Sequence, residues 1–97
     1  MNAFKAKEES SKAGVMTRFP NQPAFGSVKI QSVFYSSENP SQTLFLYDKD
    51  GDLFLFPVPG QVSPSPIGLE APVTVNLPIY YLDSLGGNEI ILFGEMA

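Results

Sequence analysis

Acidic side chains stand at alternate positions in Asp48, Asp50 and Asp52, a spacing that could present several oxygens to a cation. Hard cations such as calcium take several oxygen ligands, so this D-x-D-x-D run is a candidate calcium site. An EF-hand loop needs glycine at its sixth position, but here Gly51 stands at the fourth, and the twelfth position is Pro59. We therefore favour a turn with solvated acids over a metal site, and we expect no cofactor.

Catalytic side chains are scarce in this chain, which contains no His and no Cys. Their absence removes Ser-His-Asp and Cys-His nucleophilic machinery, the commonest general base and most zinc geometries. Four tyrosines could stack on sugars, but Tyr in a small β-domain is more often a core residue with its hydroxyl at the edge; they are Tyr35, Tyr47, Tyr80 and Tyr81. The sequence predicts a non-enzymatic protein, with a glycan- or calcium-binding module as an alternative.

The three acids lie in the most structured stretch of the sequence, Gln42 to Pro57. Asp-Gly between two apolar runs predicts a hairpin with a two-residue type I′ turn, which needs positive φ at both central residues. That turn sets a register in which Lys49 faces Asp52, and Tyr47 faces Phe54. In the same register Leu46 faces Leu55, and Phe45 faces Phe56. Both surfaces of the ribbon are then apolar, so we expect each to be covered by the rest of the chain or by another chain.

The sequence on either side of the hairpin, within residues 27–97, predicts further short strands. Alternation of apolar and polar residues marks 27–35 and 73–77, and apolar runs mark 79–82 and 89–93. The stretch 57–72 holds five of the nine prolines, which allow only a brief edge strand at Ile67 and Leu69. Six or seven strands at this spacing predict an all-β protein, a small antiparallel β-sandwich of jelly-roll type spanning residues 27–97.

Residues 1–26 differ from this body in composition and charge. Residues 1–18 carry four basic and two acidic side chains, whereas residues 19–97 carry two basic and eight acidic ones. With two prolines and few large apolar residues, the segment predicts an extended N-terminal arm that another subunit holds in place. The acidic body argues against nucleic acid as a partner, because a basic surface supplies affinity for phosphates. No run of eighteen apolar residues or signal-type segment is present, so we expect neither a membrane partner nor a secretory address.

The order of these elements resembles the small β-sandwich virion proteins of tailed bacteriophages, especially head decoration (capsid cement) proteins. The likeness covers residues 27–95 and rests on Leu46-Tyr47-Asp48 with Gly51 in the hairpin and on Leu92-Phe93-Gly94 at the end. It implies a structural protein on the outer surface of the capsid, bound across neighbouring major capsid subunits, often as a homotrimer. It implies no catalytic residues.

Our candidate partner-binding residues come from the hairpin and from the arm. They are Phe45, Tyr47, Phe54 and Phe56 in the hairpin, and Phe4, Lys5, Lys7, Lys12, Arg18, Phe19 and Phe25 in the arm. A structural role in the tail, neck or fibre base is an alternative with the same sequence features, and copy number per particle would separate it from decoration. An inhibitor of a host protein also stays open, because such proteins share no signature.

Overall fold

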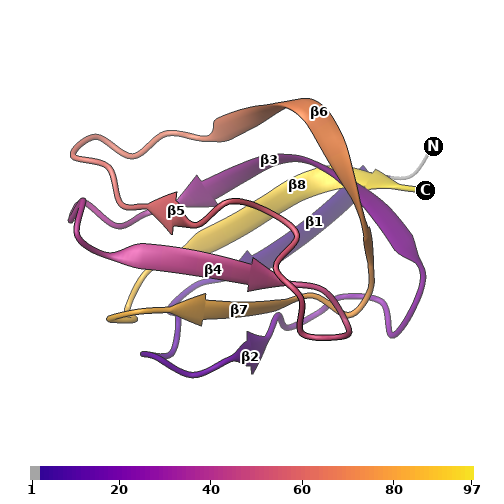
Figure 1. The fold of residues 1–97 in the computed structure, drawn as a ribbon, viewed down its shortest axis with the longest axis horizontal. Coiled ribbons are helices and arrows are strands. Elements are labelled where there is room, and N and C mark those ends of the chain that lie inside the picture. Colours follow the sequence, from indigo (N-terminus) through magenta and orange to yellow (C-terminus); the bar gives the residue numbers. More distant parts are fainter. Residues whose placement is uncertain (1–2) are drawn as a thin grey trace.

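The computed structural model describes residues 3–97, and every regular element in that range is a β-strand. The eight strands are β1 (Ala3–Glu8), β2 (Thr17–Arg18), β3 (Ser27–Tyr35), β4 (Thr43–Tyr47), β5 (Val58–Pro59), β6 (Ile67–Asn76), β7 (Tyr80–Asp83) and β8 (Ile90–Met96). They form two antiparallel four-stranded sheets, in the orders β1-β8-β3-β6 (sheet A) and β2-β7-β4-β5 (sheet B). The two sheets pack as layers of a sandwich (Figure 1), as the spacing of strands predicts.

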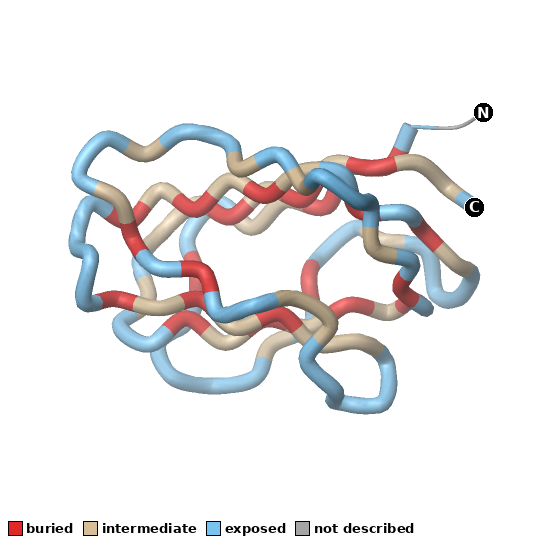
Figure 2. The backbone as a smooth tube through the Cα atoms, turned by 45° about the horizontal axis from the view of Figure 1, so that its top comes forward, coloured by how far each residue is buried: buried red, intermediate tan, exposed pale blue. Residues whose placement is uncertain are grey.

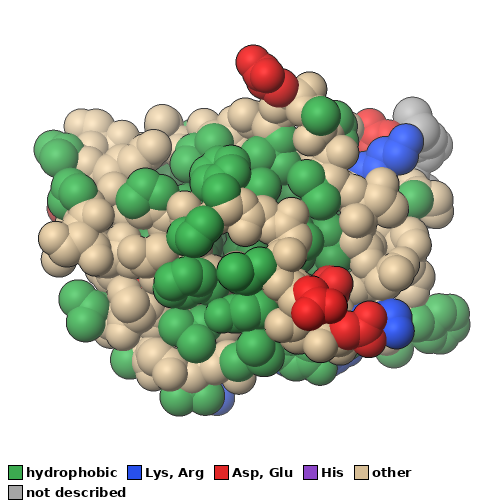
Figure 3. Space-filling model, in the orientation of Figure 1, with side chains coloured by type: hydrophobic (Ala, Val, Ile, Leu, Met, Phe, Trp, Pro, Cys, Tyr) green, Lys and Arg blue, Asp and Glu red, His purple; other side chains and the backbone are tan. Residues whose placement is uncertain are grey.

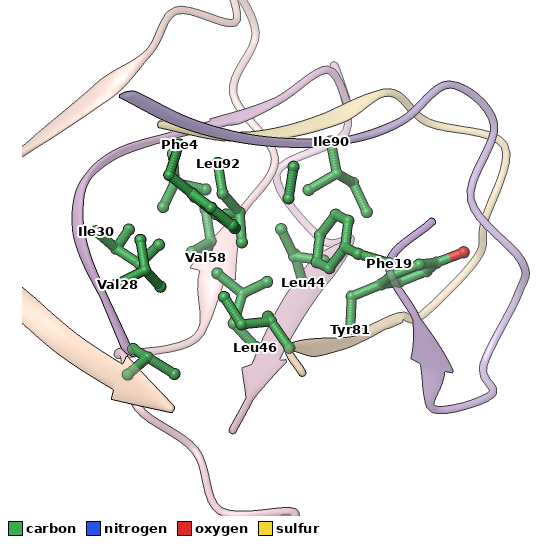
Figure 4. Close-up of a cluster of buried hydrophobic side chains, with 14 of the residues drawn as sticks. Phe4, Phe19, Val28, Ile30, Leu44, Leu46, Val58, Tyr81, Ile90 and Leu92 are labelled. Carbon is green, nitrogen blue, oxygen red and sulfur yellow. The ribbon is translucent and has the colours of Figure 1, made fainter. Parts of the chain in front are cut away.

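The core lies between the two sheets and is built from side chains that alternate along each strand. In β4, Leu44 and Leu46 are buried and their neighbours Phe45 and Tyr47 are half-buried. Figure 2 shows the same alternation of buried and less buried positions along several strands. Figure 4 shows core side chains from both sheets meeting in one cluster; its labelled members include Ile30, Leu92, Val58 and Tyr81.

The N-terminal segment is part of this sandwich, so the expected extended arm is not confirmed for residues 3–26. Strand β1 pairs with β8 from Ala3↔Glu95 to Glu8↔Ile90, and Thr17 and Arg18 pair with β7. Residues 1–2 of the predicted arm lie outside the described residues. Alternation explains the difference: Phe4 and Ala6 face the core while Lys5 faces out, so the segment has the period of a strand.

The hairpin exists, but its predicted turn and register are wrong. Gly51 has a φ of 81°, and Asn21 is the one non-glycine residue of 3–97 with a positive φ, so Asp50 does not have the conformation that a type I′ turn requires. The Gly51 N–H donates to the Asp48 carbonyl (3.1 Å) and the Asp48 N–H donates to the Asp52 carbonyl (2.8 Å). These bonds indicate a three-residue loop with glycine in the left-handed region.

The longer loop moves the register by one residue, so that Tyr47 pairs with Leu53 instead of facing Phe54. The Phe54 N–H donates to the Leu46 carbonyl, and this places Phe54 on the core side of the ribbon. Further along, Leu44 pairs with Val58. Four residues then separate Leu53 from Val58 and only two separate Leu44 from Tyr47, so the second limb of the hairpin bulges.

Elsewhere the predicted strands are found. Residues 27–35 form β3 with the predicted bounds, and the predicted edge strand at Ile67 and Leu69 joins the predicted strand 73–77 as the single edge strand β6. Eight strands form where six or seven were predicted, because β1 and β2 come from the segment assigned to the arm. The all-β sandwich is thus observed, whereas its jelly-roll type is not confirmed.

Candidate interaction surface

The outer surface of sheet B carries large apolar side chains that point away from the core. Strand pairing places Phe45 opposite Leu82 and Tyr47 opposite Tyr80, and Tyr47 also pairs with Leu53. The first four are half-buried and Leu53 is 49% exposed, and none of the five belongs to the core cluster. We call these five residues the aromatic face. In the view of Figure 3, hydrophobic side chains gather across the middle of the molecule, with acidic side chains beside them.

The outer surface of sheet A differs from the aromatic face in its charge content. It also carries half-buried apolar residues, Phe34, Ile91 and Phe93, but charged and amide side chains stand among them. Lys5 Nζ lies 5.9 Å from the centre of the Phe93 ring, and Gln31 Nε2 donates to Glu95 Oε1 at 3.1 Å. Sheet A is therefore an ordinary solvated surface, whereas the aromatic face has the composition of a protein interface.

The structure brings only some of the predicted partner-binding residues together. Phe45 and Tyr47 lie on the aromatic face, and Phe56, in the bulged limb of the hairpin, is 53% exposed. Phe54 packs against the core. Its predicted place among the outward aromatics is wrong, because the register is shifted.

The residues expected in the arm are dispersed. Phe4 and Phe19 are buried in the chain's own core, so they do not anchor a partner. The exposed side chains among them are Lys5, Lys12, Arg18 and Phe25, of which Phe25 is 83% exposed, while Lys7 makes an ion pair with Glu89 at 3.2 Å. Arg18 reaches the aromatic face from its edge, because it pairs with Tyr80.

In the acidic turn, residues 48–52, the Asp48 side chain accepts hydrogen bonds from the backbone of the turn itself. Asp48 Oδ1 accepts the N–H groups of Asp50 (2.8 Å) and Asp52 (3.0 Å), an Asx-type arrangement that holds the loop. Lys49 Nζ lies 3.4 Å from Asp50 Oδ1, not opposite Asp52 as predicted. Within residues 3–97 no group of three or more His, Cys, Asp or Glu side chains is arranged to hold a metal ion.

A buried carboxylate, Asp83 at the end of β7, joins the two sheets at one end of the sandwich. Its Oδ1 accepts the Tyr35 hydroxyl (2.6 Å) and Gln42 Nε2 (2.9 Å), and its Oδ2 accepts the Ser11 hydroxyl (2.5 Å) and Asn88 Nδ2 (3.0 Å). These four donors come from four separate segments of the chain. Both oxygens are saturated, so the carboxylate acts as a structural acceptor and has no free lone pair for a substrate.

Titration of this cluster follows from its hydrogen bonds. Burial raises the pKa of Asp83, but the four donors, Ser11 first, outweigh burial and hold the pKa below its ordinary value. Burial and the hydrogen bond to Asp83 raise the pKa of Tyr35, so its phenol stays protonated and keeps donating. The Tyr81 hydroxyl is also used internally, donating to Glu8 Oε2 at 3.1 Å. Two of the four tyrosines are thus core residues and not part of a sugar platform.

Three residues of the aromatic face, Leu53, Tyr80 and Leu82, are not among the partner-binding residues predicted from the sequence. The signal for Tyr80 and Leu82 was present, since they alternate with the inward residues Ile79 and Tyr81. Their place beside Phe45 and Tyr47 depends on the pairing of β4 with β7, which are far apart in the sequence.

Comparisons with protein-family models, with curated proteins and with solved structures find no match to this chain. The described residues enclose no pocket. No helix in residues 3–97 has the length and apolar character needed to cross a membrane.

Proposed function

We propose that this chain is a virion structural protein that decorates a phage capsid, and that it binds neighbouring major capsid subunits through the aromatic face. The observation that carries the proposal is that face itself, a set of outward apolar side chains on one sheet, contrasted with the charged outer surface of the other sheet. The capsid as partner follows from the resemblance of residues 27–95 to head decoration proteins.

Energetics support a role in assembly. Complete burial of a large apolar side chain contributes about 1.5–3 kcal/mol relative to full exposure. The residues of the aromatic face are half-buried before binding, so together they contribute on the order of 5 kcal/mol. That value lies at the low end of the ~4–15 kcal/mol cost of association, so each contact is weak and repetition over many capsid sites supplies the occupancy.

The chemistry of the face agrees with a protein partner. Tyr47 and Tyr80 present an apolar ring with a polar tip, and aromatic residues of this kind are enriched at protein interfaces. Arg18, at the edge of the face, adds a planar donor suited to a carboxylate on the partner.

The test is binding to phage heads that lack this protein, measured by co-sedimentation. Wild-type protein should bind, and a Phe45→Thr/Tyr80→Thr variant should bind at least about 10-fold more weakly, since two outward rings are lost. Thr is compatible with a strand, so the variant should stay folded. Phe34→Thr, on the outer surface of sheet A, is the matched control and should bind like the wild type.

Two results would overturn the proposal. Failure of the wild-type protein to sediment with the heads would reject capsid decoration. Equal binding by the double variant and the wild type would reject the aromatic face as the contact. A copy number of only a few per particle would favour the tail, neck or fibre base.

A further inference from the structure

The acidic turn contains the dipeptide Asp50-Gly51, in which a side-chain carboxyl group and a backbone nitrogen can react with each other. The nitrogen that follows an aspartate can attack the carboxyl carbon of that aspartate, because the ring that closes has five members and the chain already holds both groups together. A side chain on the following residue hinders the attack, and glycine has none. Of the four aspartates in the sequence, only Asp50 precedes a glycine.

The structure leaves the carboxyl group of Asp50 available for this reaction. Its side chain is 65% exposed, and Lys49 Nζ lies 3.4 Å from its Oδ1. By contrast, Asp83 is buried and accepts four hydrogen bonds, and Asp48 Oδ1 accepts two backbone N–H groups. The remaining aspartate, Asp52, precedes a leucine, whose side chain hinders attack. A free carboxyl group and an unhindered nitrogen therefore occur together at Asp50 alone among the four aspartates.

The backbone nitrogen of Gly51 has room to move toward that carboxyl group. No atom lies within 4 Å of the position that a Cβ on Gly51 would occupy. The Gly51 N–H donates to the Asp48 carbonyl at 3.1 Å, and this bond must open before the nitrogen can attack. Exposed turns open locally at a small free-energy cost, so the folded protein can reach the reactive conformation.

We propose that Asp50 is a site of spontaneous modification, at which the Asp50-Gly51 peptide converts to isoaspartate in the folded protein and loosens the hairpin. In the first step the Gly51 nitrogen bonds to the Asp50 carboxyl carbon, the C–OH bond of that carboxyl breaks, and the hydroxyl group leaves with the nitrogen's proton as water. In the second step water adds to the main-chain carbonyl carbon of Asp50, and the bond from that carbon to the nitrogen breaks. Water is the only other reactant in the two steps.

The product changes the length of the turn. Isoaspartate carries the main chain through the Cβ and Cγ atoms of residue 50, so the backbone gains a CH2 group while the mass and the charge of the protein stay the same. The Asp48 N–H donates to the Asp52 carbonyl at 2.8 Å, and Tyr47 pairs with Leu53 directly beyond. These contacts depend on the present length of the loop, because loop length sets the register of a hairpin.

The consequence reaches the aromatic face, to which Tyr47 and Leu53 both belong. Conversion at residue 50 loosens the pairing of these two residues and so alters one edge of that face. The reaction takes place within a single chain, so it does not depend on the proposed capsid contact.

The test is incubation of the full folded chain in mildly acidic buffer over several weeks. Digestion after aromatic residues then releases residues 48–54, which follow Tyr47 and end at Phe54. Isoaspartate appears as a second peak of equal mass, which fragmentation locates and which an isoaspartyl methyltransferase labels from S-adenosylmethionine. Conversion at Asp50 should be at least about 10-fold faster than at any of the other three aspartates.

Two substitutions at the exposed side chain of residue 50 serve as matched variants. Asp50→Glu keeps the charge but needs a six-membered ring, so it should form at least about 10-fold less product than the wild type. Asp50→Asn keeps the five-membered ring and releases ammonia in place of water. It should therefore convert to aspartate and isoaspartate with a rise in mass.

Hydrogen exchange of converted and fresh chains measures the loosening of the hairpin. The Phe54 N–H donates to the Leu46 carbonyl across the hairpin, and the Asp48 N–H closes the turn. Both amides should exchange faster in converted chains, whereas the amides of β3 should be unchanged.

Any of four results would overturn the proposal. They are the absence of isoaspartate at residue 50, equal conversion at all four aspartates, equal product from Asp50→Glu and the wild type, and unchanged exchange of the Asp48 and Phe54 amides in converted chains.

Discussion

Replacement of Asp83 by Asn should destabilise the protein strongly, although the two side chains have nearly the same shape. The carboxylate accepts four donors and is fully buried. An amide supplies one oxygen and one NH2 group, so the NH2 group must face two of those donors. If the NH2 group faces Ser11 and Asn88, the Ser11 hydroxyl can turn to accept, but Asn88 Nδ2 cannot. If the NH2 group faces Tyr35 and Gln42 instead, the Tyr35 hydroxyl can turn to accept, but Gln42 Nε2 cannot.

The magnitude follows from these contacts. One buried donor left unpaired costs about 1–3 kcal/mol, and the remaining bonds weaken because they lose the charged acceptor. Lower desolvation of the neutral amide offsets part of this loss. We expect a loss of about 3 kcal/mol, and a domain of this size loses about 4–8 °C in Tm for each kcal/mol.

Urea unfolding at neutral pH, followed by circular dichroism, measures this loss. Asp52→Asn, at an exposed carboxylate in the hairpin turn, is the control and should stay within about 0.5 kcal/mol of the wild type. An Asp83→Asn protein as stable as that control would refute the account of Asp83 as the acceptor that joins the two sheets.

The same pair of proteins gives a pH signature. The pKa of Asp83 is lower in the folded state than its ordinary value of 3.8, so its ionised form stabilises the fold above that value. This contribution is lost as the pH falls through the folded pKa. The stability difference between wild type and Asp83→Asn should therefore be constant near neutral pH and shrink below about pH 4. A difference that grows on acidification would contradict the sign of the shift.

Two further predictions concern packing and compare matched residues in urea unfolding. Gly94→Ala should lose at least about 2 kcal/mol, because its methyl group would meet the backbone of β3 at Lys29, whereas Gly68→Ala, whose methyl group meets no atom within 4 Å, should be nearly neutral. Phe19→Ala should cost about 3–5 kcal/mol, because the ring is fully buried, whereas Phe25→Ala should change stability by less than about 0.5 kcal/mol. An equal loss of stability for the two variants of either pair would contradict the packing described for Gly94 or for Phe19.

The sequence predicts this fold where the pattern is local. Alternation identifies β3 to the residue, and the prolines of 57–72 correctly place Ile67 and Leu69 in an edge strand, although that strand is not brief and runs through Pro72 to Asn76. The turn at Asp50-Gly51 was assigned the wrong type, because the dipeptide suits both a two-residue loop and the left-handed glycine of a three-residue loop. A one-residue difference in the loop then changed every partner in the second limb.

The remaining features depend on distant pairings that no local pattern specifies. Phe4 and Phe19 were assigned to a partner surface because their segment is polar and rich in breaks, yet β8 and β7 provide the strands beside which they become buried. The aromatic face likewise needs β4 beside β7. No local pattern in the sequence marks Asp83, and its role appears only when Ser11, Tyr35 and Gln42 converge on it.

The pairing of β1 with β8 has a consequence for synthesis of the protein on the ribosome. β1 leaves the ribosome before its hydrogen-bonding partner, which comes from residues 90–96. Until those residues leave the exit tunnel, the nascent chain exposes Phe4 and an unpaired strand, the kind of surface that chaperones recognise. Sheet A can therefore be completed only after residues 90–96 have left the tunnel, and a chain that stops before β8 leaves β1 without a paired strand and β3 paired with β6 alone.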